Sequence, residues 1–283
     1  MHILLAGATG VLGRRLIPLL VRDGHQVTAL TRRPASSAVL RKLGANPLVA
    51  NVFERDSVIA LTRDARPDAV VHQLTDLSGG DLRRNAELRE MGTRNLVDAA
   101  LAADVQRIVA QSIAWAYVGG ELPATEEESL DLDADEPRRT TVLGVAALES
   151  AVREVPGHVL LRYGLLYGPG TWFTAGGAYA DRLRPNDDVT SFVHVDDAAR
   201  AAVSALDWDP ATLNIADDEP APGREWVPVF CRAVHAPEPP PSPVGERSAW
   251  ARGADNSLAC KHFGWSPRHE SWRTGFAESP AGQ

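Results

Sequence analysis

Lysine is nearly absent from this 283-residue chain, whose 29 basic residues include only two lysines, Lys42 and Lys261. No run of basic residues offsets the formal net charge of −8, and contacts with nucleic-acid phosphates require clustered Lys and Arg. Cysteine is equally scarce, because Cys231 and Cys260 are too few for a disulfide framework or a metal site. These absences exclude a nucleic-acid-binding protein and leave small molecules as the expected partners.

Long apolar runs are missing as well. No stretch approaches the ~20 residues that a membrane-spanning helix needs, and the opening "MHILLAGATG" shows neither a basic leader nor a cleavage site. Hydrophobic residues make up 44% of the chain and charged residues 23%, which is ordinary for a folded globular protein. We therefore expect a cytoplasmic protein without membrane contact, present as a monomer or a homodimer.

Short β-rich runs alternate with helical patterns along the first part of the chain. The expected strands are residues 2–6, 26–30, 47–50, 68–72, 107–111 and 158–162, and amphipathic helices are expected at 11–22 and 85–103. This alternation is typical of an α/β fold, a Rossmann-type doubly wound parallel sheet. Later strands are expected at 191–195 and 213–216, and a helix at 197–206. We predict a dinucleotide-binding core at 1–167 and a smaller substrate-binding C-terminal lobe at 168–283, with about 191–216 returning to the core.

The segment "GATGVLG" places Gly7, Gly10 and Gly13 directly after the first expected strand and at the start of the first helix. Glycines at this spacing permit a tight turn, a close approach of the backbone to a pyrophosphate, and close packing of helix on sheet. The helix N-terminus adds free N–H groups and the positive end of its dipole. The alternative is a plain βα turn, but both flanks match a dinucleotide site.

The second expected strand ends in Thr31, Arg32 and Arg33, where a site that prefers NAD(H) usually carries an acidic residue for the ribose 2′-hydroxyl. Guanidinium groups suit the 2′-phosphate of NADP(H), because they present planar, charged donors to its oxygens. The alternative is a solvated basic turn. These residues favour NADP(H) over NAD(H).

At this point the chain resembles the extended short-chain dehydrogenase/reductase superfamily, the NAD-dependent epimerase/dehydratase group. The resemblance covers nearly the whole length and rests on "GATGVLG" (7–13), "GTRNLVDAA" (92–100), "SIAWAY" (112–117), "LRYGLLYGPG" (161–170), "FVHVDDAARA" (192–201) and "FGWSP" (263–267). It implies that the cofactor is held along the carboxy edge of the sheet. The positions that match are Gly7, Thr9, Gly10, Val11, Leu12 and Gly13 at the pyrophosphate, Thr31, Arg32 and Arg33 at the adenosine ribose, Asn51 and Val52 at the adenine, and His72, Gln73, Leu74, Gln111, Tyr163, Gly164 and Leu166 towards the nicotinamide.

The resemblance also implies a catalytic tyrosine and, four residues later, a lysine that lowers its pKa, because a phenol is otherwise a poor base at neutral pH. Counted back from Glu149, which matches the acidic residue of the family's helix, these positions hold Val142 and Ala146. None of the four tyrosines is followed by a lysine four residues later, so no shift of alignment restores the pair. We predict an atypical family member.

Other side chains at the expected cofactor edge offer weaker proton chemistry. The candidates are Ser112, which matches the family's serine, the phenols of Tyr117 and Tyr167, and His194, whose free pKa lies near neutrality. Each has a structural alternative: strand-end hydrogen bonding for Ser112, packing for the two tyrosines, and the start of a helix for His194.

Aromatic residues in the same motifs suggest the substrate. Asp76, Trp115, Trp172, Phe173 and Phe192 are the expected contacts, and aromatic walls favour a bulky, aromatic or secondary-metabolite small molecule over a sugar nucleotide. We predict an NADP(H)-dependent oxidoreductase acting on a carbonyl or activated double bond. Two alternatives stay open, a non-redox isomerase, dehydratase or cyclase, and a non-catalytic NADP(H)-binding regulator.

Overall fold

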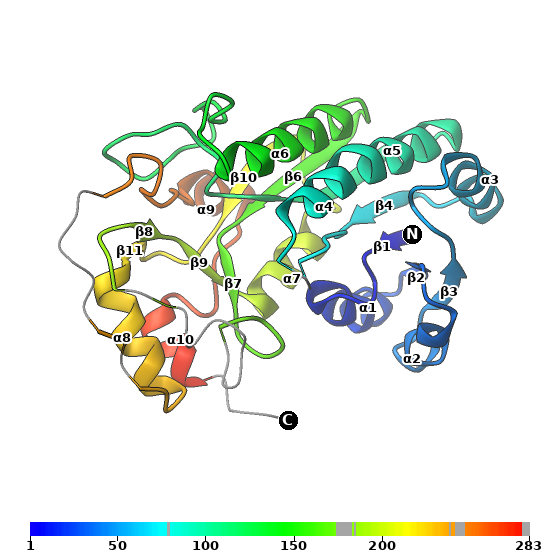
Figure 1. Ribbon diagram of the computed structural model, residues 1–283. Helices are drawn as coiled ribbons and strands as arrows, with labels where there is room; N and C mark the ends of the chain where they lie inside the picture. The colour runs from blue at the N-terminus through cyan, green and yellow to red at the C-terminus, as the bar shows by residue number, and fades with distance from the viewer. Residues whose placement is uncertain (78–79, 174–182, 184, 238, 241–246, 279–283) are drawn as a thin grey trace. The chain divides into compact units, whose positions relative to one another are not determined.

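A parallel sheet of seven strands organises the computed structural model, which describes residues 1–283 except 78–79, 174–182, 184, 238, 241–246 and 279–283 (Figure 1). The strand order is β10-β6-β5-β4-β1-β2-β3. The strands are β1 (His2–Ala6), β2 (Gln26–Thr31), β3 (Asn46–Val49), β4 (Ala69–His72), β5 (Arg107–Ile113), β6 (Gly157–Tyr163) and β10 (Ala211–Ile215). The pairings of β1 with β2 and β4, of β2 with β3, and of β4 with β5 are parallel. The predicted Rossmann-type α/β fold is confirmed.

Helices connect these parallel strands, as crossover connections require. They are α1 (Val11–Arg22), α2 (Ser37–Lys42), α3 (Arg55–Ala65), α4 (Leu82–Glu87), α5 (Thr93–Ala102), α6 (Arg138–Val152) and α7 (Val195–Ser204). Figure 1 shows α1 on one side of β1 and β4, and α4 and α5 on the other. The helix predicted at 85–103 is interrupted by one π-helical stretch, η2 (Leu88–Gly92), and stretches of this kind are frequent at functional sites.

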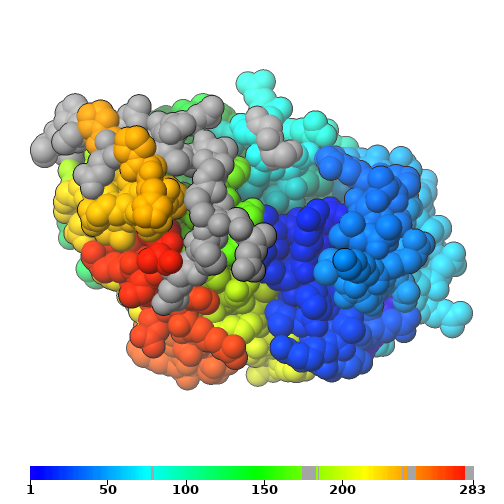
Figure 2. Space-filling view, turned by 90° about the horizontal axis from the view of Figure 1, so that it is seen from below, coloured from blue at the N-terminus to red at the C-terminus, as the bar shows by residue number. Residues whose placement is uncertain are grey.

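The later part of the chain forms small elements of its own. They are β7 (Leu165–Tyr167), β8 (Val189–Thr190), β9 (Phe192–His194), β11 (Ala221–Pro222), α8 (Gly223–Ala233), α9 (Ser257–Phe263) and α10 (Trp272–Glu278). The strand predicted at 191–195 is β9, which pairs in parallel with β7 in a separate two-stranded sheet. The helix predicted at 197–206 begins earlier, at Val195. Figure 2 shows α8 and α10, in orange and red, side by side.

The chain forms two compact units, each assembled from three segments. Unit 1 comprises residues 1–112, 132–161 and 199–212, and unit 2 comprises 113–131, 162–198 and 213–283. The predicted division placed a boundary after residue 167 and returned about 191–216 to the core. In the structure β5, β6 and β10 each contain residues of both units, so the segments of the two units alternate along the chain.

Each unit has its own apolar core. In unit 1 the core is aliphatic and includes Leu4, Val70, Leu96 and Leu148. In unit 2 it is aromatic and includes Tyr167, Phe192, Phe230 and Trp272. Among the residues that the structure describes, no helix is long and apolar enough to cross a membrane, and no cluster of His, Cys, Asp and Glu is suited to a metal ion.

Candidate active site

The glycine loop between β1 and α1 forms a tight cradle in unit 1. Gly7 has φ +87°, in the left-handed region, and a Cβ there would overlap the carbonyl group of Gln73 at the end of β4. A Cβ on Gly13 would overlap the carbonyl oxygen of Gly7. Helix α1 has no side-chain cap, because its N-cap residue Gly10 offers no side-chain acceptor to the first N–H groups. The cradle therefore fits a pyrophosphate at a helix N-terminus.

The two arginines of the basic turn after β2, Arg32 and Arg33, have different surroundings. The Thr31 hydroxyl accepts a hydrogen bond from the Arg33 backbone N–H at 3.2 Å, which shapes the turn. Arg32 lies 3.5 Å from the Asp76 carboxylate, which also binds Arg84 at 2.8 Å. The Arg33 side chain is exposed and makes no ion pair with the described residues. Arg33 is thus available to a phosphate, whereas Asp76, expected at the substrate, is engaged by arginines of its own unit.

Asn51 and Val52, the predicted adenine contacts, take part in hydrogen bonds within unit 1. The Asn51 side-chain oxygen accepts from the Phe53 N–H at 3.3 Å, and the Val52 carbonyl accepts from the buried Asn95 amide at 2.9 Å. Val52 itself is buried in the core.

His72, the last residue of β4, is neutral and structural. Its Nδ1 accepts from the Leu74 N–H at 3.2 Å, so Nε2 carries the proton and donates to the Thr93 hydroxyl at 2.8 Å. Burial, and secondly the positive charge of Arg89, lower the pKa of His72 to about 4. The ring thereby fixes the position of Leu74 beside the glycine loop.

We expect this lowered pKa to make the protein less stable in acid. Between pH 6.5 and about 4 the unfolded chain binds a proton at His72 that the folded chain does not, so the free energy of unfolding falls as the pH drops, by at most about 1.4 kcal/mol per pH unit. Urea unfolding at several pH values measures this slope. His72→Asn, which keeps an acceptor for the Leu74 N–H, should have a shallower slope, and parallel slopes would contradict the assignment.

Two buried side chains of unit 1 carry polar atoms that form no hydrogen bond with the described residues. Gln73 is 5% exposed and Arg89 6%, and neither the Gln73 side-chain amide nor Arg89 Nη1 has a hydrogen-bond partner among the described residues. Burial lowers the pKa of Arg89 to about 10. Buried polar groups are normally satisfied, and a buried charge without a counterion is costly. Both residues therefore have donors to offer a ligand.

The neighbours of Arg89 locate it within unit 1. It lies in η2, three residues after Ala86, whose Cα is 2.9 Å from where a Cβ on Gly144 of α6 would lie. Four residues after Arg89 comes Thr93, which binds His72 at the end of β4. Arg89 thus sits in the helical segment that packs on both α6 and the end of β4. Arg89 was not among the predicted site residues, because an arginine in an amphipathic helix gives no sign of burial.

Ser112 and α6 show what replaces the expected catalytic pair. The Ser112 hydroxyl donates to Glu149 at 2.7 Å, and the fully buried Glu149 also binds Arg153 at 2.9 Å. Val142 and Ala146 lie seven and three residues before Glu149, on its face of the helix. The Gln111 amide donates to the Leu74 carbonyl at 3.3 Å. The Ser112 hydroxyl is therefore directed towards Glu149 of α6, and Val142 and Ala146 of the same helix have no ionisable proton.

The two tyrosine candidates lie in the interior of unit 2. The Tyr117 hydroxyl donates to the Asn214 side chain at 2.6 Å, and burial raises the pKa of Tyr117 to about 12, although Arg162, 4.7 Å from the ring centre, opposes the shift. Tyr167 lies in β7, not on a loop, and is fully buried with its ring edge-on to Phe192 and Phe276. These environments favour structural roles for both phenols.

His194 is also held by its surroundings. Its Nδ1 accepts from the Asp196 N–H at 3.2 Å, and its ring stacks on His269 with 3.7 Å between centroids. Among the other predicted contacts, Phe173 and Phe192 belong to the aromatic core and Trp172 packs against it. The Tyr163 hydroxyl donates to the Ala198 carbonyl at 3.3 Å, and Leu166 is half-buried in β7.

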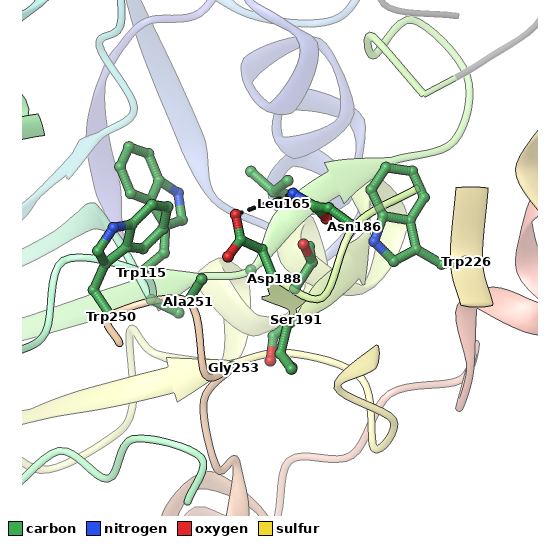
Figure 3. A pocket seen from close by; sticks show the side chains of 13 residues that line it. Trp115, Leu165, Asn186, Asp188, Ser191, Trp226, Trp250, Ala251 and Gly253 are labelled. Carbon is green, nitrogen blue, oxygen red and sulfur yellow. Dashed lines mark hydrogen bonds between the residues drawn. The ribbon is translucent and has the colours of Figure 1, made fainter. Parts of the chain in front are cut away.

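A pocket of about 330 Å³ opens in unit 2 (Figure 3). Its described lining is Ala114, Trp115, Gly164, Leu165, Asn186, Asp188, Val189, Thr190, Ser191, Trp226, Trp250, Ala251 and Gly253. Three indoles, one carboxylate and no Lys, Arg or His belong to this lining. Trp115 and Gly164 were among the predicted site residues. Trp226, Trp250 and Asp188 were not, because they lie outside the motifs that carry the resemblance.

Comparisons with known proteins agree with this architecture. The sequence model of the NAD dependent epimerase/dehydratase family matches residues 3–216. A 3-diazoavenalumate denitrifying reductase from a Streptomyces species is 39% identical over 305 residues, covering 97% of this chain and 99% of the relative. A ceramide reductase from Caulobacter vibrioides is 26% identical over 82% of this chain and 69% of the relative. The structure of a Thermotoga maritima UDP-glucose 4-epimerase with UDP-glucose superimposes with TM-score 0.80 at 18% identity, covering 99% of this chain and 97% of that one, a likeness of fold alone.

Proposed function

The chain belongs to the NAD-dependent epimerase/dehydratase family, and on this premise we propose that it is an NADPH-dependent reductase that replaces the diazonium group of an aromatic compound with hydrogen. The coarser statement, an oxidoreductase of the short-chain dehydrogenase/reductase type, follows from the family and the reductase relative. The diazo substrate comes from the name of that relative, to which this chain is similar over almost its full length.

The absence of a Tyr-x-x-x-Lys pair carries the proposal. Reduction of a carbonyl group needs a proton for the oxygen as well as a hydride. In an arenediazonium ion the hydride supplies both electrons of the new C–H bond, and the electrons of the broken C–N bond leave with dinitrogen. The products are the arene, N2 and NADP⁺, and the balance requires no proton. A site with Val142 and Ala146 in place of the pair, and with the Ser112 proton directed to Glu149, is sufficient for that reaction.

Unit 1 has the residues to hold the cofactor, whose nicotinamide supplies the hydride when bound. The glycine loop and the uncapped start of α1 fit the pyrophosphate, and Arg33 is available for a 2′-phosphate. Gln73 and Arg89 Nη1 offer buried donors that have no partner in the described part of the chain. We assign these donors to the cofactor, where their hydrogen bonds would be satisfied. The preference for NADPH rests on Arg33, because Arg32 lies against the Asp76 carboxylate.

The pocket of unit 2 supports an aromatic substrate. A nucleoside diphosphate sugar would bring two negative charges, which proteins usually meet with Arg or Lys. The described lining instead supplies Trp115, Trp226, Trp250 and the Asp188 carboxylate. This composition favours a flat, uncharged or positively charged ring over the UDP-sugar present in the Thermotoga epimerase structure.

Product analysis tests the proposed reaction. With an arenediazonium salt and NADPH deuterated at both C4 positions, we expect one N2 per NADPH oxidised and deuterium on the ring carbon that carried the diazonium group. Mass spectrometry of the gas and the arene measures both. Unlabelled NADPH in D2O is the control, and should give arene without deuterium. Oxidation of NADPH without N2, or ring deuterium drawn from D2O, would refute the proposal, and NADPH binding without oxidation would support a cofactor-binding regulator instead.

Removing the candidate proton donors should leave this turnover nearly intact. We expect Ser112→Ala and Tyr117→Phe to release N2 within about threefold of the wild-type rate, because no proton is transferred, whereas loss of a general acid costs roughly 100-fold or more. Melting temperatures measured alongside identify a variant that has lost structure, since each change removes a buried hydrogen bond. A 100-fold loss in a variant that melts like the wild type would mean that the reaction does need the proton.

A further inference from the structure

Three indoles from distant parts of the sequence share the unit 2 pocket. Trp115 follows β5, Trp226 lies in α8, and Trp250 belongs to the segment between α8 and α9. Figure 3 shows Trp115 and Trp250 beside each other and Trp226 on the far side of the pocket, with Asp188 between them. A pocket of about 330 Å³ is at the small end of ligand sites and suits a compound of one or two rings.

The carboxylate of Asp188 is fixed in place by neutral groups only. One oxygen accepts from the Ser248 backbone N–H at 2.8 Å, and the other accepts from the Asn186 side-chain amide at 3.1 Å. Arg224 pairs with Asp187 and Arg252 with Glu128, and the neighbouring Arg247 donates to the backbone carbonyls of Gly120, Ala249 and Ala251. No ion pair joins Asp188 to any residue that the structure describes. Among the described residues, its negative charge therefore has no direct ion-pair partner at the wall of an aromatic pocket.

Trp226 adds a directional group. It is 7% exposed, and its indole N–H has no hydrogen-bond partner in the described part of the chain. Its ring packs edge-on to Phe192 and Phe173, with centroids 5.1 and 5.7 Å away. Figure 3 shows the indole nitrogen on the edge of the ring that faces the pocket. A buried donor of this kind is normally satisfied, so its orientation indicates a ligand with an acceptor atom.

We propose that this pocket binds a planar aromatic cation that carries a hydrogen-bond acceptor such as a carboxylate or carbonyl. The ring lies against the indoles, Asp188 balances the positive charge, and the acceptor receives the Trp226 N–H. Indole faces attract cations through the quadrupole of the ring, and a nearby unpaired carboxylate adds to that attraction. The inference rests on the proposed function, because an arenediazonium ion is such a cation. It specifies which features of the substrate the pocket recognises.

Unreactive probes test this site without any chemistry. N-methylpyridinium supplies a flat aromatic cation, N-methylpyridinium-4-carboxylate adds the acceptor, and benzonitrile is the neutral isoelectronic analogue of benzenediazonium. Calorimetric titration of the cofactor-free chain measures each affinity, and the tryptophan indole N–H signals in NMR report the place of binding. We expect the cation to bind at least roughly tenfold more tightly than benzonitrile. The carboxylated probe should bind more tightly still and should shift the indole signal that Trp226→Phe removes.

Matched variants separate charge from packing. In Asp188→Asn, the affinities for N-methylpyridinium and benzonitrile should lie within about threefold of each other. Asp187→Asn changes the neighbouring carboxylate, which is already paired with Arg224, and should leave the preference for the cation unchanged. Trp250→Phe should weaken all three probes. Equal affinity for cation and benzonitrile, or an unchanged preference in Asp188→Asn, would overturn the proposal. These results do not depend on turnover: N2 release without selective probe binding would remove this inference alone, and selective binding without N2 release would remove the proposed reaction alone.

Discussion

Replacing Arg89 by methionine is expected to raise the melting temperature of the cofactor-free protein and at the same time to weaken its binding of NADPH. The guanidinium is buried, its pKa is lowered to about 10 by that burial, and no carboxylate balances it among the described residues. Replacing buried charged groups by well-packed apolar side chains of similar volume is often neutral or stabilises a protein by about 1–4 kcal/mol. At roughly 2–4 °C per kcal/mol for a chain of this size, the gain should be visible in a thermal melt.

The loss of affinity should be large, because hydrogen bonds from a charged donor contribute about 1.5–3 kcal/mol, or roughly ten- to 150-fold in Kd. Calorimetric titration with NADPH measures it. Arg94→Met is the matched control: Arg94 in α5 binds Glu154 at 2.6 Å and Asp98 at 2.7 Å, so its loss should lower the melting temperature and spare the cofactor. A destabilised Arg89→Met variant with normal NADPH affinity would show that Arg89 is structural.

Gly7→Ala is expected to abolish measurable cofactor binding. Gly7 has φ +87° and its missing side chain leaves room for the carbonyl of Gln73, so a methyl group forces the loop away from β4. The N–H groups that would cradle the pyrophosphate then lose their alignment. We expect a rise in Kd of roughly 100-fold or more, equivalent to about 3 kcal/mol, measured by calorimetry with NADPH.

Gly24→Ala separates this effect from backbone strain. Gly24 has a similar φ of +82°, but no atom lies within 4 Å of its added Cβ. Both variants therefore carry the cost of a left-handed non-glycine residue, about 1 kcal/mol, and only Gly7→Ala disturbs the cradle. Equal NADPH affinity in the two variants would mean that the loop does not hold the cofactor.

Local sequence patterns predicted the sheet and the glycine loop well. The strand at 2–6 and the helix at 11–22 have the predicted bounds, because an apolar run followed by glycines and an amphipathic repeat are properties of neighbouring residues. The missing catalytic pair was also visible in the sequence, since the pair is defined by spacing within one helix. Tyr167 was predicted as a proton donor at the cofactor edge, whereas β7 places this residue in the aromatic core.

What the sequence by itself determined is the α/β fold, the glycine cradle and the absence of a lysine-activated tyrosine, all of which depend on residue types at short separations. Only the tertiary structure decided that Arg89 is buried without a counterion, because its burial depends on α6 and on the end of β4. It also brought Trp115, Trp226 and Trp250 around Asp188 from positions up to 135 residues apart. The burial and the charge balance of a side chain depend on all residues that are close to it in space, and the order of residues along the chain does not show which residues these are.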